Sequence, residues 1–187
     1  DVGGESTRPG HEPVSIEEEI ERVVPVIEAL KRKLSIPISI DTYKAKTAEA
    51  AVEAGADIIN DIWGAKFEPK IATVAAKYEV PIILMHNREN KIYDSIIDDM
   101  IVDLEESIAI AKERGVRDEQ IIIDPGIGIS FGKELEDNYV VLQQLEKITQ
   151  HFSYPLLLAT SRKSFISKVL PIPPEERDNA TGATTCL

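Results

Sequence analysis

The sequence predicts an α/β protein with the fold of a (β/α)8 barrel, here lacking its first and its last strand. Six short apolar runs are interpreted as strands, and their ends are spaced about 19 to 38 residues apart, which fits βα units. The runs are apolar almost throughout, so both faces are expected to be buried, as in a parallel sheet covered by helices. Each run ends in polar or small residues, at the end where barrel strands carry their reacting groups.

A doubly wound open sheet is the alternative, because it also places ligands at the carboxyl ends of its strands. The barrel is favoured because all six ends are polar, whereas a switch point needs only two or three such ends. A barrel usually takes about 250 residues, and this chain has 187. We therefore expect residues 1–187 to form a single barrel domain that is incomplete at both ends, with one strand before Asp1 and one after Leu187.

The first helix is expected to begin at Ser15, where Glu18, three residues further on, forms a capping box with it. Pro25 lies inside this helix and is expected to kink it, because proline removes a backbone donor. Apolar residues recur along one face of the helix at steps of four and three, namely Ile16, Ile20, Val23, Ile27, Leu30 and Leu34.

Strands and helices then alternate along the rest of the chain. After a first short strand that ends near residue 3, strands are expected in PISIDT, DIIND, PIILMH, IIIDPG and PLLLATS. Helices are expected in TAEAAVEAG, KIATVAAKYE and NYVVLQQLEKI, and in a long segment whose apolar face carries Ile97, Ile101, Leu104, Ile108 and Ala111.

Composition excludes several classes of protein. The chain is 43% hydrophobic and 29% charged, as in ordinary globular proteins, and its net charge of −12 argues against nucleic acid and anionic membranes as partners. No apolar run approaches the roughly 18 residues of a membrane span. A single cysteine, Cys186, excludes a disulfide framework. With no secretory leader visible, we expect a cytoplasmic protein.

Polar side chains end three of the expected strands. Asp41, Asn60 and Asp124 follow buried runs, where an unpaired carboxylate is costly. Two aspartates and an amide that converge there would suit a flat heterocycle rich in N–H donors, such as an aminopyrimidinone. In the alternative interpretation, the aspartates cap the following helices or pair with Lys and Arg. Met85, at the end of another strand, fits either core packing or contact with a ligand.

Two further segments could contribute to a site. In SRKSF, Arg162, Lys163 and Ser164 stand where a helix is expected to begin, which favours an anion site, although an ordinary N-cap would look the same. DPGIGISFGK lacks the glycine and the hydroxyl residue of a phosphate loop, so it is interpreted as a glycine-rich cover from which Phe131 projects. The three histidines are His11, His86 and His151, and they lack the spacing of a zinc site.

Six segments together resemble the dihydropteroate synthase family: DVGGESTRPG, SIDT, DIIND, LMHNR, DPGIG and TSRKSF, in that order along the whole chain. The resemblance implies a (β/α)8 barrel. It also implies that 6-hydroxymethyl-7,8-dihydropterin pyrophosphate is condensed with p-aminobenzoate to 7,8-dihydropteroate and pyrophosphate. This transferase reaction belongs to folate biosynthesis and is the target of sulfonamides.

The resemblance also implies roles for ten residues. Pterin binding is implied for Asp41, Asn60, Met85, Asp124 and Lys163. Contact with p-aminobenzoate is implied for Thr7, Arg8, Pro9, Phe131 and Ser164. Asp41, Asp124 and Lys163 are the implied catalytic residues, with Lys163 on the pterin carbonyl. The family reads DPGIGF where this chain reads DPGIGISF, so Phe131 stands two residues further along.

Mg²⁺ is the implied cofactor, with its ligand outside this chain, so no metal ligand is expected among residues 1–187. A homodimer is implied as well. The implied mechanism breaks the methylene–oxygen bond of the pterin before much bonding to the amine, with Asp41 and Asp124 stabilising the developing positive charge. A corrinoid-dependent pterin methyltransferase and a non-catalytic pterin-binding module remain as alternatives.

Overall fold

The computed structural model describes residues 1–6, 12–128 and 132–186, and its centre is a sheet of five parallel strands. The strands are β1 (Val2–Gly3), β2 (Ser39–Asp41), β3 (Ile58–Asp61), β4 (Ile82–Met85) and β5 (Ile121–Asp124). They lie side by side in chain order, and each neighbouring pair is parallel. The order never reverses, so the described sheet has no switch point. This confirms the barrel-type parallel fold over the doubly wound alternative.

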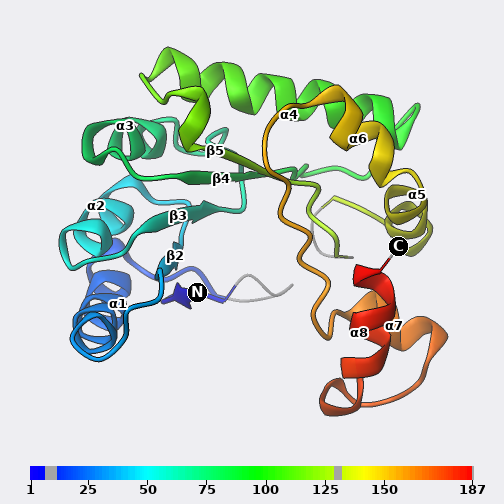
Figure 1. Cartoon of the computed structure of the whole chain (residues 1–187), viewed down its shortest axis with the longest axis horizontal. Coiled ribbons are helices and arrows are strands. Elements are labelled where there is room, and N and C mark those ends of the chain that lie inside the picture. The colour runs from blue at the N-terminus through cyan, green and yellow to red at the C-terminus, as the bar shows by residue number, and fades with distance from the viewer. Residues whose placement is uncertain (7–11, 129–131, 187) are drawn as a thin grey trace.

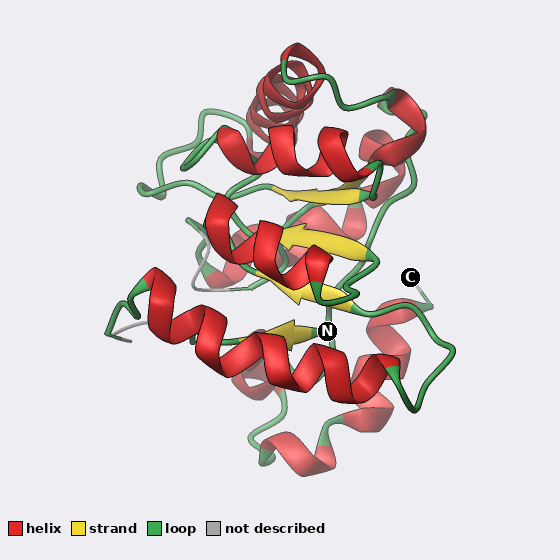
Figure 2. Ribbon diagram, turned by 90° about the vertical axis from the view of Figure 1, so that its left-hand side faces the viewer, coloured by secondary structure: helices red, strands yellow, loops and turns green. Residues whose placement is uncertain are grey.

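The described residues form eight α-helices, of which the first four connect the strands and cover one face of the sheet. They are α1 (Ile16–Lys31), α2 (Ala45–Glu53), α3 (Lys70–Tyr78), α4 (Ile96–Glu113), α5 (Leu135–Gln143), α6 (Leu145–His151), α7 (Ser164–Val169) and α8 (Asp178–Thr185). Figure 1 shows α1 to α4 following one another around the outside of the sheet, while α7 and α8 lie at the far end of the molecule. In Figure 2 these outer helices stand in front of the strands.

The two faces of the sheet differ in burial, which corrects the expectation that both would be buried. Side chains that point to the helices are almost completely buried, namely Ile40, Ile59, Ile82, Leu84, Ile121 and Ile123. On the opposite face, the side chains of β2 and β3 and that of Ile122 in β5 are only partly buried, whereas those of β4 and that of Asp124 are buried. Side chains alternate between the two faces along a strand. This second face therefore carries Asp41, Asn60 and Asp124, together with the residue two positions before each of them.

The outer face packs against apolar stripes on the helices. Val23 and Ile27 of α1, and Ile71 of α3, are inaccessible or nearly so. Helix α2 presents Ala48 and Ala51, whose small side chains let its backbone approach the sheet closely. Burying such an apolar layer supplies the main stabilising contribution to the fold.

Helix α1 begins after Ser15 as expected, but the Glu18 carboxylate binds Arg22, so the reciprocal half of the expected capping box does not form. The Ser15 hydroxyl accepts a hydrogen bond from the Glu18 backbone N–H at 3.1 Å. The helix continues through Pro25 as one element. Pro25 and Glu21, whose carbonyl loses its helical donor, are both exposed, so water can satisfy that carbonyl at little cost.

Two expected elements differ in the structure. The segment expected as a sixth strand, residues 155–161, lies parallel to β5 but forms one isolated bridge, between Ile123 and Leu156. At this bridge the Ile123 N–H donates to the Pro155 carbonyl, and the Leu157 N–H donates to the Ile123 carbonyl. Pro155 has no N–H to donate, so the pairing extends no further at that end. The helix expected over residues 138–148 is divided at Gln144 into α5 and α6.

Candidate functional site

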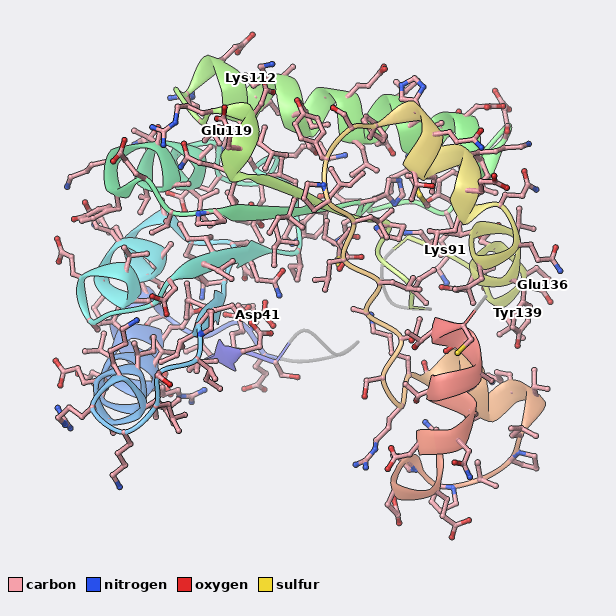
Figure 3. The ribbon with its side chains drawn as sticks, viewed as in Figure 1. Asp41, Lys91, Lys112, Glu119, Glu136 and Tyr139 are labelled. Atoms are coloured by element: carbon pink, nitrogen blue, oxygen red, sulfur yellow. The ribbon has the colours of Figure 1, made fainter. Side chains whose placement is uncertain are left out.

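The strand register brings the predicted polar residues together on the inner face of the sheet. Asp41 pairs with Asn60 across β2 and β3, and Met85 pairs with Asp124 across β4 and β5. Asp41 lies at the end of β2, on the side of the sheet away from α1 and α2 (Figure 3). Paired residues on adjacent strands point to the same face, so these four side chains share one surface.

This surface forms a cavity of about 410 Å³. Its lining includes all five residues for which pterin binding is implied: Asp41, Asn60, Met85, Asp124 and Lys163. The rest of the lining consists of Asp1, Ser39, Ile58, Ile62, Ile83, Leu157 and Ala159. Met85 is only 4% exposed and still contributes to the wall, so core packing and contact with the cavity are compatible at this position.

Asp41 is the most unusual group of the cavity. Its Oδ1 atom is buried and accepts no hydrogen bond from the described part of the chain. Burial, reinforced by the negative charges of Glu19 and Asp61, raises the pKa of Asp41 to about 6, while Lys163 opposes the rise. A buried carboxylate oxygen without a donor is energetically unfavourable, so this atom is poised to accept a hydrogen bond from a ligand.

Asp124 is buried as well, but it has a backbone partner. Its Oδ1 accepts the Gly126 N–H at 2.6 Å. Burial raises the pKa of Asp124, while that hydrogen bond and the positive charges of Lys163 and Lys133 oppose the rise.

Lys163 supplies a cation between the two carboxylates. Its Nζ donates to the Ile127 carbonyl, and burial lowers its pKa against the attraction of Asp124 and Asp41. Lys163 directly precedes α7, whose first residue, Ser164, is exposed and lies outside the cavity lining. Arg162 does not join an anion site, because its guanidinium binds Asp178 at 2.6 and 2.8 Å.

Alternation along β3 separates two neighbouring polar residues. Asn60 faces the cavity, whereas Asp61 points to the helices. Asp61 accepts the backbone N–H groups of Trp63 at 2.9 Å and Ala65 at 2.7 Å, so it stabilises the turn after the strand.

Four of the predicted contacts for p-aminobenzoate cannot be placed. Thr7, Arg8, Pro9 and Phe131 lie outside the described residues. Sequence reasoning also missed a buried polar cluster beside the cavity, formed by Lys133, His86 and Asp103. Only one signal could have pointed to it, the lysine that closes the glycine-rich segment DPGIGISFGK.

The arrangement of the cavity suits a planar, polar ligand. Carboxylates at Asp41 and Asp124 can accept hydrogen bonds from N–H groups, and the Lys163 ammonium group can donate to a carbonyl oxygen. Isoleucines and Met85 provide apolar surface for the faces of a ring.

We expect Asp41→Asn to stabilise the ligand-free protein by up to about 3 kcal/mol at pH 8, because asparagine cannot ionise. The folded-state pKa of Asp41, about 6, exceeds its value of 3.8 in an unfolded chain. Stability contributed by the wild-type carboxyl group therefore falls as the pH rises from about 4 to about 6. Urea unfolding of both proteins at pH 5 and pH 8 measures the effect. An equal difference at the two pH values would contradict the ionisation argument.

Comparisons with known proteins point to one family. The sequence profile described as "Pterin binding enzyme" matches residues 1–187. A dihydropteroate synthase of Bacillus subtilis is 58% identical over the whole chain, which spans 65% of that relative's length.

Among solved structures, a dihydropteroate synthase from Clostridium difficile, crystallised in the presence of pteroic acid, matches with a TM-score of 0.93 and 47% identity. That match covers 98% of this chain and 69% of the other. A dihydropteroate synthase from Xanthomonas albilineans with 4-aminobenzoic acid matches with a TM-score of 0.92 and 37% identity, covering 98% and 67% of the two chains.

Proposed function

This chain belongs to the family of pterin-binding enzymes, and we propose on that premise that it carries the pterin site of a dihydropteroate synthase. The reaction joins 6-hydroxymethyl-7,8-dihydropterin pyrophosphate to p-aminobenzoate and releases pyrophosphate. It is a transferase step of folate biosynthesis.

One observation carries this proposal. The cavity holds a buried carboxylate oxygen, Oδ1 of Asp41, that accepts no hydrogen bond from the described residues. The amino and ring N–H groups of a pterin are donors of the required kind. Asp124, on the same face of the sheet, is a second acceptor for the same ring, and Lys163 is the donor for its carbonyl.

The proposed chemistry is mainly electrostatic. The bond between the pterin methylene carbon and the pyrophosphate oxygen breaks first, and positive charge develops on the pterin. Asp41 and Asp124 stabilise that charge, because both carboxylates already face the ring and need little reorganisation. An arylamine is unprotonated at neutral pH, so it attacks the methylene carbon without a strong general base.

Contacts with the second substrate remain predictions. Ser164 at the start of α7 is proposed to receive the carboxylate of p-aminobenzoate, while Thr7, Arg8, Pro9 and Phe131 are proposed to enclose its ring. We propose Mg²⁺ as the cofactor that neutralises pyrophosphate. No cluster of three or more His, Cys, Asp or Glu side chains suited to a metal occurs among residues 1–6, 12–128 and 132–186, so no ligand is assigned in this chain.

Partners and compartment are proposed from the same premise. We propose a homodimer that acts in the cytoplasm on small-molecule substrates. In the described part of the chain, no helix is both long and apolar enough to cross a membrane.

The direct test is release of pyrophosphate. The full-length protein that contains this chain is incubated with dihydropterin pyrophosphate and magnesium, with and without p-aminobenzoate. We expect release that depends on the amine. Methyl transfer from a methylated pterin to a corrinoid, without amine-dependent release, would favour the methyltransferase. Pterin binding without either reaction would favour a binding module.

A further inference from the structure

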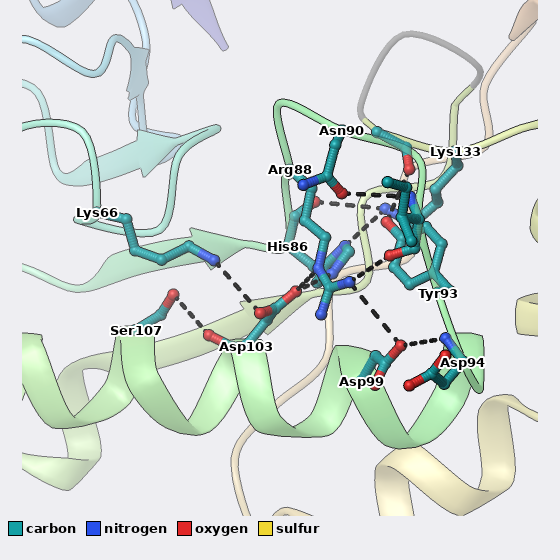
Figure 4. Close-up of polar contacts among 12 residues, drawn as sticks. Lys66, His86, Arg88, Asn90, Tyr93, Asp94, Asp99, Asp103, Ser107 and Lys133 are labelled. Carbon is teal, nitrogen blue, oxygen red and sulfur yellow. Dashed lines mark hydrogen bonds and ion pairs between the residues drawn. The ribbon is translucent and has the colours of Figure 1, made fainter.

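A buried chain of polar groups lies next to the cavity. Lys133 is completely inaccessible to solvent, and its Nζ lies 2.7 Å from Nδ1 of His86 and 3.5 Å from the His86 carbonyl oxygen. His86 is also inaccessible, and its Nε2 lies 2.8 Å from Oδ2 of Asp103 on α4. Figure 4 shows these side chains in line, with Arg88 bound to the same carboxylate.

The contacts define the protonation of His86. A lysine ammonium group only donates hydrogen bonds, so Nδ1 of His86 must be the acceptor and Nε2 must carry the hydrogen that Asp103 accepts. Burial lowers the pKa of His86 to about 4, although Asp103 opposes this, and the ring is therefore neutral. Burial alone would raise the pKa of Asp103, but hydrogen bonds from His86 and Arg88 hold it well below its usual range.

The same cluster is connected to Asp124 through the backbone. The His86 N–H donates to the Asp124 carbonyl at 2.8 Å, and the Gly126 N–H donates to the Asp124 carboxylate at 2.6 Å. Gly126 itself lies against Lys133, because a Cβ atom on Gly126 would be 3.2 Å from the lysine Nζ. Lys133 is absent from the cavity lining, so it acts on a ligand only through these neighbours.

We propose that Lys133 is a positioning residue of the pterin site, whose ammonium group, held by His86 and Asp103, keeps the carboxylate of Asp124 ionised for the ligand. The inference rests on the proposed function, in which Asp124 binds the pterin. The charged groups that face Asp124 are Lys163 and Lys133. Those that face Lys133 are Asp124, Lys163, Asp137 and Asp103.

The charge on Lys133 limits the useful pH range of a test. Burial lowers the pKa of Lys133 to about 7, against the attraction of Asp124. The ammonium form therefore predominates below that pH. The contribution of Lys133 should therefore be larger below pH 7 than above it.

The test compares full-length wild-type protein with Lys133→Met and Lys91→Met. Binding of 6-hydroxymethylpterin is measured by calorimetry from pH 5 to pH 7. Loss of a nearby cation raises the pKa of a carboxyl group, so in Lys133→Met the pH at which affinity is half-maximal should rise by about one unit. Lys91 is a matched control, because its exposed ammonium group pairs with Glu134 at 3.0 Å. A Lys133→Met profile that superimposes on the wild-type profile would overturn the inference.

A second measurement needs neither activity nor a folded variant. Nitrogen NMR of the His86 ring in the wild-type protein should show a protonated Nε2 and an unprotonated Nδ1. A protonated Nδ1 would overturn the inference, because it could not accept a hydrogen bond from Lys133. Absence of pterin binding by the wild-type protein would instead contradict the proposed function, whatever the tautomer of His86.

Discussion

Asp124→Asn is expected to weaken pterin binding by the full-length protein about 100-fold, the effect of losing a charged hydrogen-bond acceptor in a buried site. Asparagine has nearly the same shape, and its carbonyl oxygen can still accept the Gly126 N–H that Asp124 binds at 2.6 Å. The change therefore removes the charge and one acceptor while preserving the local backbone. Calorimetric titration with 6-hydroxymethylpterin at pH 7 measures the loss.

A surface substitution of the same kind provides the control. Asp118 is exposed and pairs with Lys112 at 2.8 Å, so Asp118→Asn should leave pterin affinity unchanged.

Arg8→Ala, in the segment expected to enclose p-aminobenzoate, should reduce turnover far less than Asp124→Asn does. Equal losses of turnover in these two variants would contradict the proposed division between the pterin and p-aminobenzoate subsites.

Gly126→Ala is expected to reduce the free energy of unfolding by about 3 kcal/mol or more. Gly126 has φ +66°, a left-handed conformation that costs a residue with a Cβ about 1–2 kcal/mol. The added Cβ would also lie 2.2 Å from the His86 carbonyl oxygen, a backbone atom that cannot turn aside. The loop after β5 must therefore move, and the Gly126 N–H with it. Urea unfolding and pterin titration should both show a loss.

Gly182→Ala distinguishes this local conflict from a general effect of adding a methyl group. Apart from its chain neighbours and its own helix backbone, no atom of the described residues lies within 4 Å of a Cβ built on Gly182, which is inside α8. Alanine should stabilise the protein there by up to about 1 kcal/mol, because it forms helix more readily than glycine. Similar losses of stability in both variants would show that the contact between Gly126 and His86 is not the cause.

Much of the architecture could be predicted because it depends on short-range patterns. Apolar runs that end in polar residues identified β2 to β5, and the steps of four and three identified Val23 and Ile27 on the buried face of α1, whereas Leu34 lies beyond the end of the helix and is exposed. Ser15 was recognisable as an N-cap because the bond that it forms spans only three residues. The prediction of a strand at 155–161 was wrong, because a strand also needs continuous pairing with a neighbouring strand, and this segment forms only one bridge to β5.

The candidate site was predictable to the extent that it follows from strand ends. Asp41, Asn60 and Asp124 were expected to converge, and they line one cavity. Asn60 was singled out in the sequence, but the role of its neighbour Asp61 in the turn after β3 was not, because the face to which Asp61 points depends on the register of the strand. Residue type alone did not separate Lys163, which faces the cavity, from Arg162, which binds Asp178 on α8, and only the family resemblance singled out Lys163.

The sequence by itself determined the class of fold, the polar ends of the strands and the family, since all of these are encoded in residues close together in the chain. Only the tertiary structure decided that Lys133, His86 and Asp103 meet beside Asp124. These three residues come from a loop, a strand end and a helix, at separations of 17 and 47 residues. Such contacts arise from the packing of whole elements, and packing between distant segments leaves no periodic signal in the sequence.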